Sequence, residues 1–264
     1  MMETMLITGG AGYVGVSLIE YFRDKYKIVI LDNLSKGRIE NVSHLLDKVV
    51  LETVDIRDSH KVDEIIRKHS PKIVIHLAAI VDAFSTNRRG KDEECMHVNY
   101  NSAVETARIA KNNGVLNFIF QSSVSMYSRG ENISEDGETN PLSTYGRAKM
   151  YAEKEILELN DDSFSACVLR PATLIGWNSG FRYETIINMS CIRSVHNIPL
   201  FFFESALTNP KSYLWLKDNA RSMEFALKNM GSMKGQSYNI SSFNVSLDRV
   251  IEIIKKYLGR DFNH

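Results

Sequence analysis

The sequence predicts an α/β protein built on a doubly wound parallel sheet, and three observations support this prediction. Short apolar segments alternate with amphipathic stretches over the first two thirds of the chain. The first apolar segment runs into a glycine-rich one, Thr8-Gly9-Gly10-Ala11-Gly12-Tyr13-Val14-Gly15. The second apolar segment ends on an acid, Asp32. Nearly continuous apolar strands are typical of a parallel sheet that helices cover on both faces, as in the Rossmann fold.

The elements follow one another in a regular order. Apolar and β-branched runs predict strands at residues 5–8, 28–32, 49–54, 72–77, 116–121 and 165–169. Apolar residues at helical spacing predict helices at residues 12–25, 59–69, 93–113 and 144–159. In such an arrangement ligands bind beyond the carboxyl ends of the strands.

After Pro171 the pattern becomes irregular. Helices are expected at residues 184–195, 218–229 and 247–258, the last with Ser246 as its N-cap and Gly259 as its stop. We therefore expect a dinucleotide-binding Rossmann domain over residues 1–172. Residues 173–264 are expected to form a small, C-terminally shortened substrate-binding lobe, part of which can add to the first sheet.

Composition narrows the class of protein. The chain has 264 residues, and Lys+Arg and Asp+Glu both total 32, so no basic surface points to nucleic acid. Its three cysteines lack CxxC spacing, which fits a reduced cytoplasmic protein better than a disulfide scaffold or a metal site. The sequence opens into an apolar strand without a signal-peptide pattern, and no apolar run approaches the roughly 18 residues of a membrane helix.

The glycine-rich segment has the spacing of a phosphate-binding turn. Gly9, Gly12 and Gly15 follow the first strand and open the first helix. Glycine at these positions lets the chain turn sharply, lets the backbone approach a pyrophosphate and lets helix and strand pack closely. The N–H groups at the start of the helix, near Tyr13 and Val14, then face the phosphates.

An acid at the end of the second strand suits the ribose of a dinucleotide. The carboxylate of Asp32 can accept hydrogen bonds from the ribose hydroxyls and would repel a 2′-phosphate, which favours NAD over NADP. Asp55 and Ile56 follow the third strand and are placed to meet the adenine ring. The alternative for Asp55 is a turn or a helix cap.

A tyrosine and a lysine share one face of a predicted helix. Tyr145 and Lys149 lie four residues apart. A phenol is a poor base at neutral pH, but a nearby ammonium and a cationic nicotinamide ring would lower its pKa. Tyr145 could then take a proton from a substrate hydroxyl while the carbon below loses hydride to the cofactor. The alternative is an ordinary surface pair of a helix.

The serines after residue 121 are candidates for a second catalytic group. The strand ending at Gln121 runs into Ser122-Ser123-Val124-Ser125. Ser123 is the first choice for a hydrogen bond to the reacting oxygen, and Ser125 is the second. The alternative for each is capping of the turn.

With these pieces in place, the chain resembles the extended short-chain dehydrogenase/reductase family, in its sugar-nucleotide epimerase/dehydratase branch. The matching segments run in family order over nearly the whole chain: TGGAGYVG from Thr8, LDNLSKGR from Leu31, VDIRD from Val54, HLAA from His76, Val98-Asn99, SSVSMY from Ser122, YGRAK from Tyr145, LRPAT from Leu169 and YNISS from Tyr238. The resemblance implies a catalytic trio of Ser123, Tyr145 and Lys149.

The resemblance also implies the remaining contacts to the cofactor. Asn99 would support the active-site strand, and Pro171 would lie near the nicotinamide carboxamide. The other residues expected at the cofactor are Gly9, Gly12, Tyr13, Val14, Gly15, Asp32, Asn33, Asp55, Ile56, Leu77, Ala78, Ala79, Ser122, Tyr145 and Lys149.

The activity implied is that of a nucleotide-sugar epimerase similar to the UDP-glucose 4-epimerases. Such an enzyme oxidises a sugar hydroxyl with NAD and returns hydride to the other face of the keto sugar. Dehydratases of this family carry an Asp-Glu pair after the serine-like position, where this chain has Val124 and Ser125. No acid is then placed to protonate a leaving hydroxyl. A keto-sugar reductase or another redox enzyme of the family, and a non-catalytic NAD-binding protein, remain as alternatives.

The predicted substrate residues depart from the family pattern. Thr173 stands where epimerases often have an Asn, and Lys211 stands near the position of a phosphate-binding arginine. Lysine supplies charge without the two-pronged geometry of arginine. Arg182 and Asn188, together with Ser123, complete the expected substrate site. The family also implies a homodimer in which helices 93–113 and 144–159 of two copies form a four-helix bundle.

Overall fold

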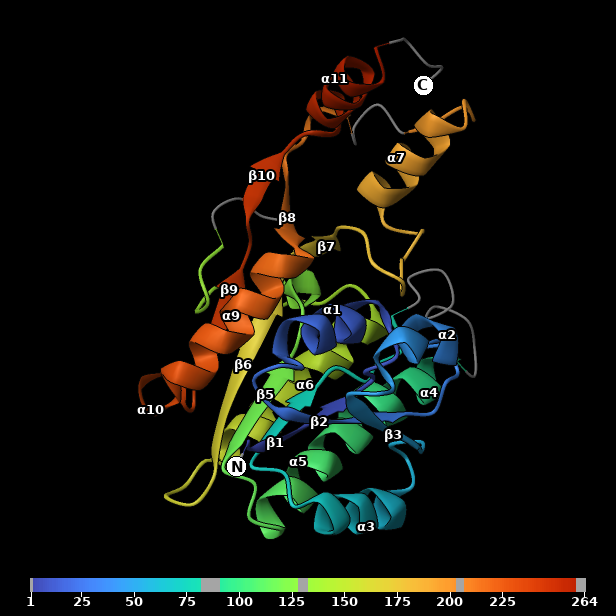
Figure 1. Ribbon diagram of the computed structural model, residues 1–264. Coiled ribbons are helices and arrows are strands. Elements are labelled where there is room, and N and C mark those ends of the chain that lie inside the picture. The colour runs from blue at the N-terminus through green and yellow to red at the C-terminus, as the bar shows by residue number, and fades with distance from the viewer. Residues whose placement is uncertain (1, 82–90, 128–132, 203–206, 260–264) are drawn as a thin grey trace.

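A seven-stranded parallel sheet forms the centre of the molecule (Figure 1). The computed structural model describes residues 2–81, 91–127, 133–202 and 207–259. The strand order is β3-β2-β1-β4-β5-β6-β9, and every neighbouring pair is parallel. The strands are β1 (Thr4–Thr8), β2 (Lys27–Asp32), β3 (Val49–Thr53), β4 (Ile73–His76), β5 (Asn117–Gln121), β6 (Ser165–Pro171) and β9 (Ser237–Ile240). This confirms the predicted doubly wound fold.

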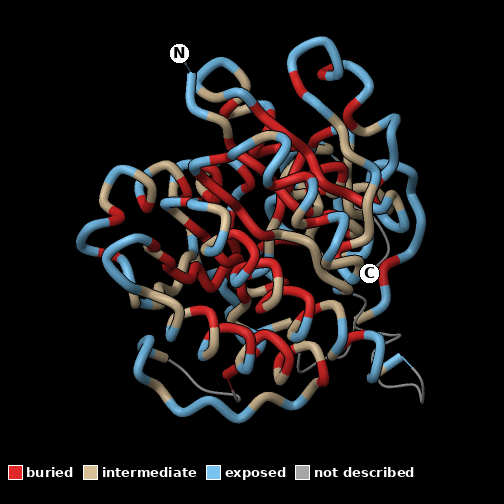
Figure 2. The backbone as a smooth tube through the Cα atoms, turned by 90° about the horizontal axis from the view of Figure 1, so that it is seen from below, coloured by how far each residue is buried: buried red, intermediate tan, exposed pale blue. Residues whose placement is uncertain are grey.

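Helices cover both faces of the sheet. One face packs against α1 (Tyr13–Phe22) and α9 (Leu216–Lys228), and the other packs against α3 (Ser59–His69), α5 (Ala103–Asn112) and α6 (Thr144–Glu158). Two short helices, α2 (Ile39–Val42) and α10 (Met230–Met233), lie at the periphery. Figure 2 shows the buried segments gathered along the strands and the inner sides of the helices. The chain reverses its direction of winding between β1 and β4. In folds of this topology, the crevice that binds ligands lies at the carboxyl ends of these two strands.

The predicted helix over residues 93–113 is interrupted. The structure divides this stretch into α4 (Lys91–Met96), a π-helical segment η2 (His97–Ser102) and α5. Asn99 lies in the π-helical segment, where its amide bonds to the backbone of Ile80. Such segments are common at functional sites because they redirect a side chain out of the regular helical register. The helix predicted to reach residue 25 also ends earlier, at Phe22.

The chain beyond Pro171 forms a small lobe and then returns to the main sheet. A three-stranded sheet of order β10-β8-β7 contains β7 (Thr173–Ile175), β8 (Lys211–Trp215) and β10 (Phe243–Val245). Together with α7 (Ile186–Val195) and α11 (Leu247–Leu258) it makes what we call the small lobe, beyond the end of the main sheet to which β6 leads (Figure 1). The small lobe has its own apolar core, which includes Leu200, Leu247 and Ile251.

The ends of α11 match their prediction. Ser246 occupies the N-cap position, although its side chain makes no capping hydrogen bond to the helix backbone. Gly259 follows the helix in a left-handed conformation with φ of 62°, which suits glycine. Among the described residues, no helix has the length and apolar character to span a membrane.

Candidate active site

The glycine-rich turn between β1 and α1 allows unusually close backbone contacts. Gly9 has φ of +68°, and a Cβ there would lie 2.8 Å from the backbone nitrogen of Ala78. A Cβ on Gly15 would lie 2.4 Å from Gly10 Cα. Because both obstacles are backbone atoms, only glycine fits. The turn therefore brings the N-terminus of α1 up to the crevice, with Gly12 as its N-cap and Tyr13 and Val14 in its first turn.

Asp32 ends β2 beside this turn. Its two carboxylate oxygens accept hydrogen bonds from the backbone of Ala11, at 3.0 Å, and Leu34, at 2.8 Å. Burial raises the pKa of Asp32, and the two N–H donors partly offset this effect. Each oxygen keeps a further lone pair for a ribose hydroxyl. Together with the helix N-terminus and the glycine turn, this carboxylate fits NAD.

The side chain of Asp55 forms a turn beyond β3. Its oxygens accept hydrogen bonds from the guanidinium of Arg57, at 2.9 and 2.7 Å, and from the amide of Asn33, at 2.8 Å. The Arg57 guanidinium holds the pKa of Asp55 well below its usual range. Asp55 thus makes the turn that the sequence left open as an alternative, and its contact with an adenine ring stays a prediction. Ile56 is buried next to it, and Asn33 is exposed.

Hydrogen bonds fix the segment after β4 against the glycine turn. The Thr8 hydroxyl accepts bonds from the backbone of Leu77 and Ala78, both at 3.2 Å. Its own hydrogen is then free to donate to His76 Nδ1, 3.1 Å away, so this ring is the neutral form with its proton on Nε2. Burial lowers the pKa of His76 to about 3, in agreement.

Asn99 holds the same segment from the other side. Its amide oxygen accepts from the backbone N–H of Ile80, at 2.7 Å, and its amide nitrogen donates to the Ile80 carbonyl, at 2.8 Å. Leu77, Ala78 and Ala79 are therefore held from both ends, partly exposed along the crevice. The structure thus brings together the predicted residues Gly9, Asn99 and 77–79.

Ser123 and Tyr145 meet at the carboxyl end of β5. Ser123 caps a short 3-10 turn, η3 (Val124–Met126), and its oxygen accepts the backbone N–H of Ser125 at 3.1 Å. A Cβ on Gly146 would lie only 2.5 Å from the Ser125 carbonyl oxygen, so the first turn of α6 contacts the serine turn directly. This contact places Tyr145 within hydrogen-bonding reach of Ser123.

Burial dominates the electrostatics of Tyr145 and Lys149. Burial raises the pKa of Tyr145 to about 12, and a hydrogen bond with Ser123 lowers it only in part. Burial lowers the pKa of Lys149 to about 8. The Lys149 ammonium donates to the Gln121 carbonyl oxygen at 2.9 Å and lies 4.5 Å from the centre of the Phe120 ring. Burial dominates the pKa of Tyr145, and the Lys149 ammonium lies 5.9 Å from the centre of the Tyr145 ring. The lowering of this pKa by the ammonium together with a cationic nicotinamide ring stays a prediction.

Two further predicted residues line the strand ends beside this pair. Ser122 is buried and continues the ladder between β5 and β6, with its N–H donating to the Leu169 carbonyl at 2.8 Å. Pro171 is the last residue of β6 and is also buried. Both residues thus lie at the carboxyl edge of the sheet, where a nicotinamide is expected.

The predicted substrate residues do not form one cluster. Asn188 is buried and donates to the Tyr13 hydroxyl, at 3.2 Å, and to the Arg182 carbonyl, at 2.8 Å. Arg182 reaches back to the Val81 carbonyl at 2.8 Å, so both lie near the cofactor turn. Thr173 is exposed at the start of β7, and its partner in β8 is Tyr213. Lys211 is exposed at the start of β8, opposite Val245.

Sequence reasoning missed the side chain of Tyr13. Its hydroxyl donates to the Gly176 carbonyl at 2.7 Å, and its backbone carbonyl accepts from Asn178 at 2.8 Å. The segment after β7 is thereby attached to the cofactor turn. The only signal in the sequence is Asn178 between Gly176 and Gly180, which indicates a tight loop but not its partner.

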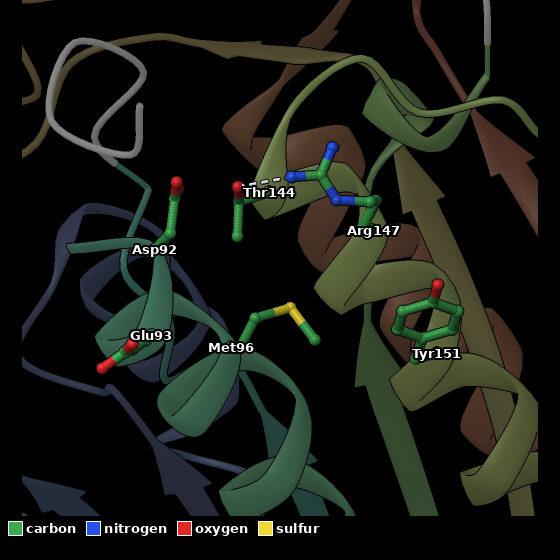
Figure 3. Close-up of a pocket in the computed structure, with 6 residues that line it drawn as sticks. All are labelled: Asp92, Glu93, Met96, Thr144, Arg147 and Tyr151. Atoms are coloured by element: carbon green, nitrogen blue, oxygen red, sulfur yellow. Dashed lines mark hydrogen bonds between the residues drawn. The ribbon is translucent and has the colours of Figure 1, made fainter. Parts of the chain in front are cut away.

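A separate hollow lies between α4 and α6 (Figure 3). It has a volume of about 490 Å³ and is lined by Asp92, Glu93, Met96, Thr144, Arg147 and Tyr151. Within it, Arg147 donates to the Thr144 hydroxyl at 2.7 Å. Its lining includes none of the predicted catalytic residues, so this hollow is distinct from the crevice.

Comparison with known proteins agrees with this geometry. Residues 5–241 match the model of the NAD dependent epimerase/dehydratase family. The chain is 30% identical over 200 residues to UDP-glucose 4-epimerase from Mus musculus, across 69% of this chain and 56% of that protein. It is 30% identical over 176 residues to UDP-glucose 4-epimerase from Rhizobium leguminosarum bv. trifolii, across 64% and 51%. The chain thus spans about half the length of these curated relatives.

Solved structures share the fold. The structure of UDP-glucose 4-epimerase from Thermotoga maritima with UDP-glucose superposes with a TM-score of 0.85 and 22% identity, over 98% of this chain and 83% of that one. UDP-glucuronic acid 4-epimerase from Bacillus cereus, in complex with UDP-glucuronic acid and NAD, has a TM-score of 0.86 and 22% identity, over 98% and 84%. Because the family model covers most of its length, the chain belongs to the NAD dependent epimerase/dehydratase family.

Proposed function

We propose that this protein is an NAD-dependent nucleotide-sugar epimerase that oxidises a sugar hydroxyl transiently and restores it with the opposite configuration. The observation that carries the proposal is the placement of Ser123 and Tyr145 close together at the carboxyl end of β5, where the first turn of α6 contacts the serine turn, beside a crevice that fits NAD. The curated relatives named UDP-glucose 4-epimerase support a UDP-sugar as the substrate.

Bound NAD supplies a hydride acceptor and a positive charge at the crevice. Tyr145 takes the proton of the sugar hydroxyl, and the Ser123 hydroxyl donates a hydrogen bond to the same oxygen. A phenol with a pKa of about 12 is a weak acid, so it needs added positive charge to ionise near neutral pH. Lys149 lies one helical turn away and can supply that charge once its ammonium turns from the Gln121 carbonyl toward the crevice.

Substrate binding is assigned to the edge of the small lobe. We propose that Arg182 and Lys211 supply positive charge for the diphosphate, and that Asn188 and Thr173 contribute polar contacts. Of these, Arg182 and Asn188 have the stronger support, because their hydrogen bonds already tie them to Val81 and Tyr13 at the crevice. Residues 1–172 then correspond to the cofactor domain, and residues 173–264 contribute the substrate lobe.

A second candidate is an NAD-binding protein without turnover. The observation that favours it is the direction of the Lys149 ammonium, which points to a backbone carbonyl while the pKa of Tyr145 is raised. In that case the crevice would bind the cofactor, and the phenol would stay protonated.

The test is a screen of purified protein with UDP-glucose, UDP-glucuronic acid and UDP-N-acetylglucosamine, followed by separation of the sugar isomers. We expect isomerisation without net NADH production and with NAD retained on the protein, and Tyr145→Phe as the inactive control. Net consumption of NADH with a keto sugar would indicate a reductase instead. NAD binding without any change in a sugar nucleotide would support the second candidate.

We also propose that two copies associate through α4, α5 and α6 in a four-helix bundle. The hollow of Figure 3 lies on this face, where the Tyr151 side chain is 44% exposed despite its size. Light scattering on the wild type and on Tyr151→Glu tests this association. A wild-type mass of one chain at micromolar concentration would contradict it.

A further inference from the structure

We propose that Arg170 is a positioning residue for the reaction, because its guanidinium ties the segment of Tyr145 and the segment of Ser123 to the same strand. It acts through two intermediaries, Glu153 and Tyr127. This inference rests on the proposed function, since it assigns a role in a reaction that Ser123 and Tyr145 carry out.

The first contact fixes α6. Arg170 is the residue before the end of β6 and is 8% exposed. Its Nε lies 3.1 and 3.0 Å from the two oxygens of Glu153, and its Nη2 lies 2.8 Å from Oε2. Glu153 is one turn beyond Lys149 and two turns beyond Tyr145, on the same side of α6. A two-pronged pair of this kind fixes both the position and the rotation of the helix relative to the strand.

The second contact fixes the serine turn. The Arg170 Nη1 donates to the Tyr127 hydroxyl at 2.5 Å and to the Glu135 carbonyl at 2.8 Å. Tyr127 ends the short turn that Ser123 begins. The Tyr127 hydroxyl donates in turn to Asn239 on β9, at 2.9 Å, so the turn is held on two strands.

The free-energy cost of burying the charges of Arg170 and Glu153 indicates a role beyond stability. Both charges are nearly buried, and Glu153 is 3% exposed. Apolar side chains of similar volume often hold a helix on a strand as well as a buried ion pair does, without the cost of removing charges from water. Apolar contacts, however, do not fix the orientation of the helix relative to the strand. One planar guanidinium can instead set the spacing between a phenol and a hydroxyl that must meet on one oxygen.

Because the segments of the active site are in close contact, the distance between Ser123 and Tyr145 is sensitive to small shifts. The first turn of α6 already touches the serine turn at Gly146, so a small shift of either segment changes the distance from Ser123 to Tyr145. A misplacement of about 1 Å in a reacting group can cost about 100-fold in rate.

The experiment compares Tyr127→Phe and Arg170→Lys with the wild type, using the sugar nucleotide on which the wild type is active. Tyr127→Phe removes one hydroxyl and leaves both buried charges paired. Arg170→Lys keeps the charge and loses the fork. We expect kcat to fall about 10-fold for Tyr127→Phe and about 100-fold for Arg170→Lys, with KM and NAD content within about twofold of wild type. Because both changes act through one path, the double variant is expected to be no slower than Arg170→Lys.

Ile66→Val is the matched control for stability. Ile66 is fully buried in α3, apart from the crevice, so its variant loses packing without touching the serine turn or α6. We expect the urea midpoint of Ile66→Val to fall about as far as that of Tyr127→Phe. The kcat of Ile66→Val should nevertheless equal that of the wild type. Wild-type kcat in both Tyr127→Phe and Arg170→Lys would overturn the role of Arg170 and leave the proposed function intact. A wild type inactive on every sugar nucleotide would overturn the proposed function and this inference with it.

Discussion

Replacing Gly15 by alanine gives a direct test of how the cofactor turn is built. The added Cβ would lie 2.4 Å from the Cα and carbonyl oxygen of Gly10, whereas ordinary contact begins at 3.4 Å. The two segments must therefore separate by about 1 Å, and no flexible side chain can absorb this movement. Overpacking of this kind costs about 1–3 kcal/mol of the free energy of unfolding.

The effect on the cofactor should exceed the effect on stability. A shift of α1 moves its first-turn N–H groups away from the pyrophosphate, and losing one or two charge-assisted bonds costs about 3 kcal/mol. That corresponds to about 100-fold weaker binding of NAD. Isothermal titration calorimetry with NAD measures this, and urea unfolding monitors stability in parallel.

A control glycine separates the steric effect from any general effect of alanine. Gly231 lies in α10, and a Cβ there meets nothing within 4 Å. Gly231→Ala should bind NAD like the wild type and be equally stable or slightly more so, since alanine favours helix by about 1 kcal/mol. Wild-type affinity for NAD in Gly15→Ala would refute the reasoning, because the helix would then not depend on this contact.

The other predictions concern the chemistry of the crevice. Tyr145→Phe should lower turnover by about 100-fold or more while NAD still binds, and unchanged turnover would exclude the phenol as the proton acceptor. Asp32→Asn removes the charge that opposes a 2′-phosphate, so the preference for NAD over NADP in binding assays should narrow about tenfold; an unchanged ratio would place the ribose elsewhere. The pKa of Lys149 is lowered to about 8 from 10.5, so between these pH values the unfolded chain holds a proton that the folded chain lacks. Lys149 therefore contributes a rise of the free energy of unfolding with pH over this interval, so the slope should be more positive in the wild type than in Lys149→Met, measured by urea unfolding at several pH values. An equal slope in both proteins would contradict the shift.

Local patterns were sufficient to predict six of the seven strands of the main sheet and most of its helices, whereas β9 was not predicted as a strand. The helix at Ser59–His69 and the helix at Leu247–Leu258 have the predicted bounds, because each shows clear helical spacing between capping residues. The strands β7 and β10 were not predicted, since three residues carry too little periodicity. The π-helical segment around Asn99 was also missed, because it depends on a bond to Ile80 from a distant part of the chain.

The candidate site was predictable in its residues but not in its electrostatics. Glycine spacing and the position of Asp32 point to the cofactor turn without any knowledge of distances. The pKa of Tyr145 depends on how deeply the phenol is buried and on where the Lys149 ammonium points, and neither follows from a spacing of four residues. The same holds for Arg170, whose partners Glu153 and Tyr127 come from separate segments.

The parallel neighbours β6 and β9 both lead from the main sheet into the small lobe, β6 into β7 and β9 into β10. These two connections therefore lie side by side at the carboxyl edge of the sheet. Hydrogen exchange should resolve two cooperative units, with amides of α7 and α11 exchanging through openings that leave β5 and β6 protected. The main sheet would then keep the proposed dinucleotide site folded while the small lobe, the proposed sugar-binding part, opens and closes independently.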